Sequence, residues 1–121
     1  MAVRANSPVP LIYKILPRAE WEAALSKGAF AGSAIDLADG FIHFSAADQA
    51  VETARRYFAG QAGLMVLVID SGVLGEGLKW EPSRGGALFP HLFRPLSCAE
   101  VIEARAAPLG EDGLPDLGEL T

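Results

Sequence analysis

The apolar run LMVLVID, residues 64–70, limits the folds open to this chain more than any other segment. All of its residues except the final aspartate are apolar, and valine and isoleucine favour strands. A strand with one solvated face alternates between apolar and polar residues, whereas a strand buried on both faces is continuously apolar. The run is too short to cross a bilayer. We therefore expect residues 64–70 to form a central strand.

The remaining segments predict further strands and two main helices. Residues 17–28 predict a helix that Pro17 opens and Gly28 ends. Residues 46–59 predict a second helix, and residues 29–40 predict a loop. Strands are expected at residues 11–15, 41–45, 78–81 and 101–106, and Pro90 and Pro95 favour extended geometry within residues 88–96. Because no crossover helices separate the later strands, we expect an α+β fold with a mostly antiparallel sheet.

The length of 121 residues is typical of one domain. Half of the residues are apolar and 21% are charged, as in folded globular proteins. We expect a flexible arm at residues 1–10, a single α+β domain at residues 11–107 and an acidic tail at residues 108–121. The tail is rich in glycine and proline, so we expect it to be solvated and to pack only lightly.

Charge and composition argue against several classes of partner. The net charge is −5 and the basic residues are scattered, so we expect no nucleic-acid partner. No segment predicts a membrane span, and the opening MAVRANSPVP lacks the hydrophobic core of an export signal. We therefore expect a cytoplasmic protein. A single cysteine, Cys98, cannot form an internal disulfide and is interpreted as a small buried side chain.

The stretch FIHFS, residues 41–45, places a histidine between large apolar neighbours. In an extended conformation Phe41, His43 and Ser45 share one face. The ring nitrogens of His43 need hydrogen-bond partners, which either the core or a ligand can supply. Ser45 precedes the second predicted helix and is interpreted as its N-cap, although a helix start can also bind an anionic group.

His91 also has apolar neighbours and raises the same two alternatives. Glu81 follows a tryptophan, and a carboxylate in that position is either partly desolvated or an ordinary exposed strand residue. Two histidines and a carboxylate can bind iron or zinc, but no local metal-binding motif accompanies them. We therefore predict no metal site.

The segments GFIHFS, FPHLF, VLVID and KWE together resemble a bacterial family known as domain of unknown function 952, over roughly residues 11–107. That family is in turn similar to the ADP-ribosyltransferase-like superfamily. Proteins of the superfamily have a split, mostly antiparallel sheet and bind NAD in a cleft between its halves. The resemblance implies the same split sheet here, with two main helices.

The resemblance also implies roles for individual residues. Lys14 stands where the superfamily has a histidine or arginine that contacts the adenosine ribose, and His43 stands where an aromatic residue stacks on nicotinamide. Glu81 is placed by its order along the chain where a glutamate contacts the nicotinamide ribose. Lys14 departs from the pattern, because an ammonium group cannot accept a hydrogen bond. Further contacts with the nucleotide are expected from Tyr13, Ser45 and His91.

Two functions follow from the resemblance. The first is an NAD-utilising or ADP-ribose-processing enzyme in which Glu81 and His43 are catalytic, with NAD as a substrate and no permanently bound cofactor. A carboxylate would stabilise the positive sugar that forms when nicotinamide leaves. The second is a non-catalytic nucleotide or small-ligand binding module on the same fold. A plain interaction domain is a third hypothesis.

Overall fold

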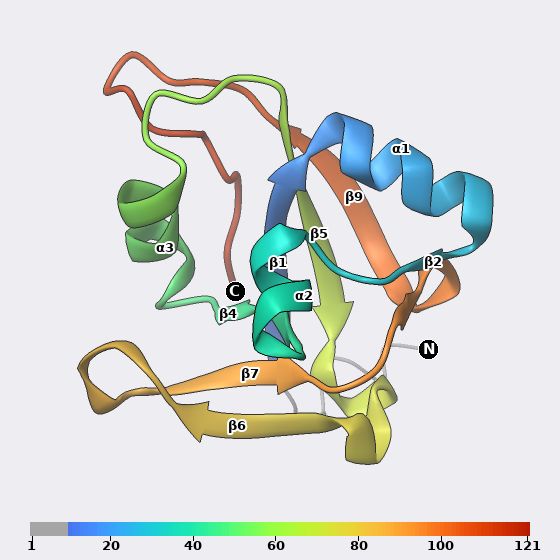
Figure 1. Ribbon diagram of the computed structural model, residues 1–121. Coiled ribbons are helices and arrows are strands. Elements are labelled where there is room, and N and C mark those ends of the chain that lie inside the picture. Colours follow the sequence, from blue (N-terminus) through green and yellow to red (C-terminus); the bar gives the residue numbers. More distant parts are fainter. Residues whose placement is uncertain (1–9) are drawn as a thin grey trace, which may run out of the picture.

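The fold is built around a four-stranded antiparallel sheet with strand order β4-β1-β5-β9 (Figure 1). This computed structural model describes residues 10–121, so nearly all of the predicted N-terminal arm lies outside the described residues. Strand β5 (Leu64–Asp70) lies between β1 (Leu11–Pro17) and β9 (Val101–Ala107). The short β4 (Ser45–Ala46) forms the other edge. The predicted central strand is therefore confirmed, with the predicted bounds.

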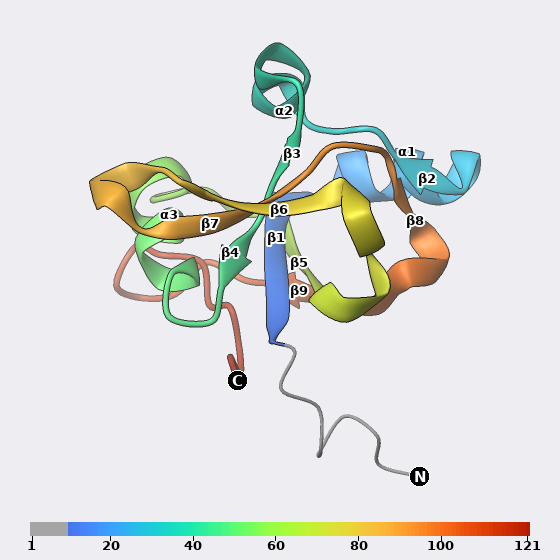
Figure 2. The same ribbon diagram turned by 90° about the horizontal axis from the view of Figure 1, so that it is seen from below.

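Alternation along β1 sends side chains into two separate cores, one on each face of this sheet. Ile12 and Leu16 face the first core, which helix α1 (Arg18–Lys27) covers with Trp21. Tyr13 and Ile15 face the second core. Helix α3 (Ala50–Tyr57) and the C-terminal segment pack on that second face, as Figure 2 shows from below. The sheet is thus covered on both sides, as its continuously apolar central strand requires.

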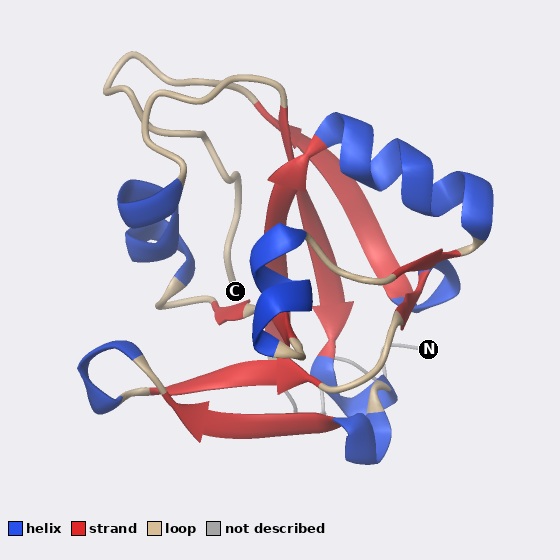
Figure 3. Ribbon diagram, viewed as in Figure 1, coloured by secondary structure: helices blue, strands red, loops and turns tan. Residues whose placement is uncertain are grey.

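Two smaller antiparallel sheets flank the central sheet (Figure 3), and they contribute Phe30, Ile42, Leu92 and Leu96 to the first core. One has the order β3-β7-β6, from β3 (Ile42–His43), β7 (Leu88–Leu92) and β6 (Leu78–Pro82). The other pairs β2 (Ala29–Phe30) with β8 (Leu96–Ser97). Short 3₁₀ helices lie at Ser71–Val73, Gly75–Gly77, Arg84–Gly86 and Cys98–Glu100. Every strand pair within residues 10–121 is antiparallel, so the predicted α+β class is confirmed.

The segment 29–40 was expected to be a loop, and that prediction is wrong. It contains β2 and helix α2 (Ala34–Asp39), which the left-handed Gly40 ends. The described residues therefore include three α-helices, one more than the two main helices expected. Polar and small residues dominate this segment, and α2 is short, so its helical periodicity is weak.

The stretch FIHFS is not one strand. It breaks at Phe44, so that β3 pairs with β7 in one sheet while β4 pairs with β1 in another. The Phe44 amide donates instead to the Pro90 carbonyl at 3.0 Å. His43 and Ser45 therefore belong to different sheets, and the prediction that they share one strand face is wrong.

Ser45 is also not the N-cap of α3. The helix begins at Ala50, because a turn intervenes in which the Gln49 amide donates to the Ala46 carbonyl at 3.0 Å. The Ser45 hydroxyl is buried and lies 2.8 Å from the hydroxyl of Thr53 on α3. Ser45 thus fixes the middle of the helix to the sheet edge, and does not cap the helix.

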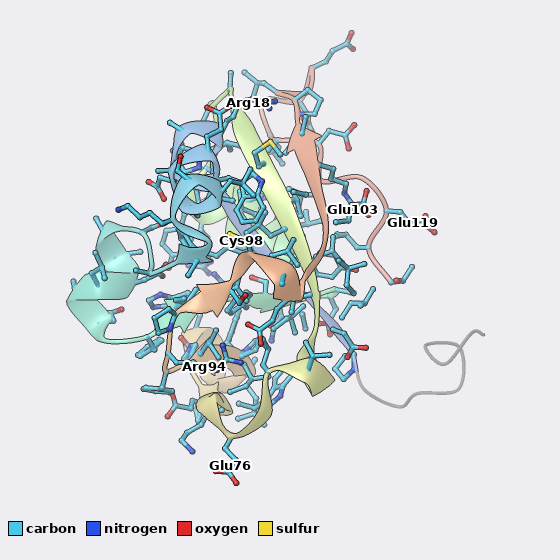
Figure 4. All side chains as sticks on the ribbon, turned by 90° about the vertical axis from the view of Figure 1, so that its right-hand side faces the viewer. Arg18, Glu76, Arg94, Cys98, Glu103 and Glu119 are labelled. Atoms are coloured by element: carbon cyan, nitrogen blue, oxygen red, sulfur yellow. The ribbon has the colours of Figure 1, made fainter. Side chains whose placement is uncertain are left out.

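The C-terminal segment packs more closely than expected. Leu117 is only 5% exposed and belongs to the second core. Arg105 Nε on β9 donates to the Leu117 carbonyl at 3.0 Å, and the Thr121 amide donates to the Tyr13 hydroxyl at 2.9 Å. Figure 4 shows Glu119 of this segment and Glu103 of β9 on the same side of the molecule. The C-terminal segment therefore packs on the second face of the central sheet.

Candidate functional site

Two histidines meet where β3 pairs with β7. His43 and His91 are register partners, and their ring centroids lie 5.5 Å apart. Phe41 stacks on the His91 ring at 4.1 Å and lies 4.6 Å from the His43 ring. Directly opposed residues of an antiparallel pair share one face of the sheet. Two segments far apart in the sequence thus form one continuous group of rings.

Strand β6 adds a carboxylate to this group. Glu81 Oε1 lies 2.8 Å from His91 Nδ1. The Glu81 side chain is 39% exposed, whereas that of His91 is only 6% exposed. Phe41, His43, Glu81 and His91 are called the histidine cluster below. Its carboxylate lies nearer to solvent than the imidazole to which it is bonded.

Asp36, on α2, holds His43 of the histidine cluster in position. Its carboxylate is almost fully buried and accepts from the Ser33 amide at 2.8 Å and from the His43 amide at 3.1 Å. It also lies 2.6 Å from His43 Nδ1 and 2.9 Å from Lys14 Nζ. Burial raises the pKa of Asp36, but His43, Lys14 and Ser33 together outweigh that effect and lower the pKa to about 2. Asp36 is therefore an ionised residue around which the site is organised.

His43 is held between two carboxylates of α2. Its Nδ1 faces Asp36, and its Nε2 lies 3.0 Å from the half-exposed Asp39. Carboxylates only accept hydrogen bonds, so the ring must donate through both nitrogens when both contacts form. One third of the His43 side chain remains exposed. The His43 ring is therefore partly exposed, while both of its nitrogens face carboxylates.

Lys14 lies beneath this arrangement and does not reach the surface of the site. It is 6% exposed, and its Nζ donates to both oxygens of Asp36, at 2.9 and 3.1 Å. Burial lowers the pKa of Lys14, and the charge of Asp36 acts in the opposite direction. Lys14 holds Asp36, and through Asp36 it holds both the backbone and the ring of His43.

The structure places Tyr13 and Ser45 away from the cluster. Tyr13 lies on the opposite face of the central sheet, where its hydroxyl bonds with Thr121. Ser45 is buried against Thr53. Of the residues expected to contact a nucleotide, the fold brings His43, His91 and Glu81 together, with Lys14 behind them. The expectation that Tyr13 and Ser45 join the same site is not supported by their positions.

Two hollows lie near these elements. One, of about 220 Å³, borders the cluster and is lined by Phe41, Asp36, Phe93 and Arg94, among others. The other, of about 510 Å³, lies between α3 and the C-terminal segment. His43, Glu81 and His91 line neither hollow. The cluster is therefore a partly exposed surface at the rim of the smaller hollow, not the wall of a deep cleft.

Sequence reasoning missed Asp36 and Asp39. Two signals were present. Ser33 stands three residues before Asp36, the spacing of a capping box, and Gly40 is a common helix end. In addition, Lys14 faces inward between Ile12 and Leu16 on a buried strand, and a buried lysine needs an acidic partner.

Neither metal binding nor cysteine chemistry finds support in residues 10–121. No group of three or more histidine, cysteine, aspartate or glutamate residues in this range is arranged to hold a metal ion. Cys98 lies beside α1, with its thiol 3.4 Å from the Ala24 carbonyl (Figure 4). Burial raises the pKa of Cys98, which lowers the share of reactive thiolate.

The fold and the site define a small α+β protein with an antiparallel core sheet and, on a secondary sheet, two histidines beside a glutamate. A family model described as "Protein of unknown function (DUF952)" matches residues 15–104, and the chain belongs to this family. The family resemblance predicted from GFIHFS and FPHLF is thereby confirmed.

Three solved structures similar to this chain are all of protein CC0527 from Caulobacter crescentus. The crystal structure is 60% identical, covers 89% of this chain and 95% of that one, and has a TM-score of 0.87. A double methionine variant gives 59% identity, the same coverage and a TM-score of 0.86. The solution NMR structure is 60% identical, covers 89% of this chain and 93% of that one, and has a TM-score of 0.81.

No functionally curated protein matches the chain. No helix within the described residues is long and apolar enough to cross a membrane.

Proposed function

We propose that the chain binds NAD, or a nucleotide containing ADP-ribose, at the histidine cluster and cleaves the bond between nicotinamide and ribose. One observation carries this proposal. Glu81 and His43, from segments far apart in the sequence, meet through His91 on one partly exposed surface. A carboxylate beside a platform of rings is the pair of groups that this reaction needs.

Each group has a role in bond cleavage. When nicotinamide departs, the ribose becomes an oxocarbenium-like cation, which a nearby carboxylate stabilises. Glu81 Oε1 is engaged by His91, while Oε2 has no hydrogen-bond partner among the described residues. Oε2 would face the developing charge. The exposed face of His43, together with Phe41, would stack on the nicotinamide ring.

An ADP-ribosyltransferase-like architecture is included in this proposal. The division of the strands into a four-stranded and a three-stranded antiparallel sheet supports it, as does the crossing of FIHFS from one sheet to the other. We assign Lys14 a supporting role behind His43, since Asp36 occupies its ammonium group. We leave Tyr13 and Ser45 out of the site, and we place the activity in the cytoplasm, where NAD is plentiful.

The test measures the release of nicotinamide from NAD by chromatography. The wild-type protein should release nicotinamide faster than buffer alone, and Glu81→Gln should reduce that rate by about 1,000-fold, because it removes the charge but keeps the size of the side chain. Thermal unfolding of both proteins controls for folding. Equal release by both proteins would contradict the role of Glu81.

A non-catalytic binding module is the second candidate. The position of the cluster favours it, because His43 and Glu81 lie at a rim and line neither of the two hollows. In that case NAD or ADP-ribose should stabilise the protein, by about 2.7 kcal/mol at 100 times the dissociation constant, while no nicotinamide appears. An interaction domain would show neither stabilisation nor release.

A further inference from the structure

His91 is the histidine of the cluster that keeps a free ring nitrogen. Its Nδ1 is engaged by Glu81, and its Nε2 makes no hydrogen bond or ion pair with any described residue. Yet no buried side-chain nitrogen or oxygen in residues 10–121 lacks a partner. Nε2 must therefore reach the surface, even though His91 as a whole is only 5% exposed. Both nitrogens of His43, by contrast, face carboxylates.

Glu81 determines which nitrogen of His91 carries the proton. An ionised carboxylate can only accept, so the contact of 2.8 Å requires a proton on Nδ1. In the neutral ring, Nε2 then presents its lone pair outward. The Phe41 ring, stacked at 4.1 Å, restricts rotation of the imidazole. The result is an imidazole oriented by a carboxylate, with an accepting nitrogen that keeps some exposure to solvent.

From this geometry we infer that His91 is the general base that activates an acceptor hydroxyl. This role rests on the proposed function. The acceptor oxygen forms a bond to C1′ of the ribose as the bond from C1′ to the nicotinamide nitrogen breaks, and nicotinamide leaves as a neutral molecule with that electron pair. The acceptor proton passes to Nε2, and the imidazolium is stabilised by Glu81 before it releases the proton to solvent.

The class of acceptor follows from this step. Water and alcohols are weak nucleophiles until they lose a proton, so they gain from a base at Nε2. A nucleophile that carries no proton gains nothing from it. We therefore assign a hydroxyl acceptor, either water or an alcohol group, to this site.

The tautomer is tested first, by ¹⁵N NMR of the histidine side chains. At a pH where the ring is neutral, the wild type should show His91 protonated at Nδ1 and unprotonated at Nε2, and Glu81→Gln should shift the ring toward a mixture of tautomers. A His91 protonated at Nε2 in the wild type would overturn the inference, whatever the activity.

The base is tested with His91→Asn, whose amide can still donate to Glu81 but offers no nitrogen in place of Nε2. Release of nicotinamide in water should fall by about 100-fold or more, and the part of its pH profile that requires an unprotonated general base should disappear. Sodium azide, which needs no base, should restore release in His91→Asn by at least about tenfold and form ADP-ribosyl azide. Azide should not restore Glu81→Gln, which lacks the charge itself. Thermal unfolding checks that both variants fold.

The proposed function and the inference about His91 as general base can be contradicted separately. If the wild type releases no nicotinamide, with or without azide, the proposed function falls and the base role falls with it. If the wild type is active and His91→Asn keeps its rate and its pH profile, only the inference about His91 is overturned. A variant that azide does not restore, although it is folded and binds NAD, also counts against the base.

Discussion

Asp36 connects three elements at the scale of single residues. It bonds Lys14 on β1, lies on α2 and holds both the amide and the ring of His43 on β3. A buried charge is costly unless it is paired, and each of these groups depends on the others for its partner. The position of the His43 ring is therefore set by a contact that no strand periodicity describes.

Replacing Asp36 should have a large effect on stability. Asp36→Asn leaves Lys14 buried without a counter-ion, so we expect a loss of about 3 kcal/mol in the free energy of unfolding at neutral pH. The control is Asp39→Asn, which alters a half-exposed contact with His43 and should cost less than about 0.5 kcal/mol. Urea unfolding measures both. Similar losses in the two variants would show that burial of Asp36 does not matter.

Comparing the wild type with Asp36→Asn at different pH values tests the ionised state of Asp36. The pKa of Asp36 is lowered from 3.8 to about 2 in the folded protein. Its contribution is therefore fully present above the unfolded pKa and is lost as the pH falls through the folded pKa. The stability difference between wild type and Asp36→Asn should shrink by about 2 kcal/mol between about pH 5 and about pH 2. A constant difference over that range would contradict the ionised state of Asp36.

At the scale of elements, helix α2 holds the His43 ring in its place in the histidine cluster. It supplies both carboxylates that hold His43, and Ser33 at its start also donates from Oγ to Glu20 of α1 at 2.6 Å. Gly32 precedes it with a φ of +129°, and an added Cβ there would lie 2.8 Å from Asp36 Cβ. The entry into α2 thus needs glycine for its backbone angle and for the space beside Asp36.

This close approach predicts a difference between two glycines. Gly32→Ala should lower the free energy of unfolding by about 3 kcal/mol, because it combines backbone strain with the clash against Asp36. Gly28→Ala has the strain alone, since φ is +85° and nothing lies within 4 Å of the added Cβ, so it should cost about 1 kcal/mol. Urea unfolding compares them. Equal costs would show that α2 adjusts freely.

Elements were predictable where local signals and tertiary structure agree. The run LMVLVID gave a strand with the predicted bounds, and helix α1 lies between Pro17 and Gly28 as expected. The prediction of one strand over FIHFS was wrong because the break at Phe44 depends on Pro90, a residue of another segment. Periodicity within five residues carries no information about such a partner.

The geometry of the candidate site was predictable only in part, because it depends on how the strands pair. His43, His91 and Glu81 could be singled out as polar groups among apolar neighbours. Their meeting depends on the pairing of β7 with both β3 and β6, which the sequence does not show directly. Asp36 was missed because it lies in a short polar helix that was interpreted as a loop.

At the scale of the whole molecule, the two faces of the central sheet have separate tasks. The small sheets contribute Phe30, Ile42, Leu92 and Leu96 to the core on the first face, whereas the second face is closed by α3 and the C-terminal segment. Arg105 donates to carbonyls of that segment at Leu117 and Glu119. The segment expected to be a solvated tail therefore contributes to the core, and it does so far from the site.

Removing the buried side chain of Leu117 from the C-terminal segment should destabilise the fold. Leu117→Ala should lower the free energy of unfolding by about 2 kcal/mol, because it opens a cavity over the second core. Leu109→Ala is the control, since Leu109 is 42% exposed and its loss should cost less than about 0.5 kcal/mol. Thermal or urea unfolding distinguishes them. No loss in Leu117→Ala would mean that the segment does not close the sheet in solution.

The most direct measurement of the central claim is an NMR titration of the isotope-labelled protein with NAD and with ADP-ribose. We predict concentration-dependent shifts for Phe41, His43, Glu81 and His91, with the signals of Tyr13 and Leu117 on the opposite face unchanged. Shifts confined to the hollow between α3 and the C-terminal segment, or no shifts with either nucleotide, would contradict a nucleotide site at the histidine cluster.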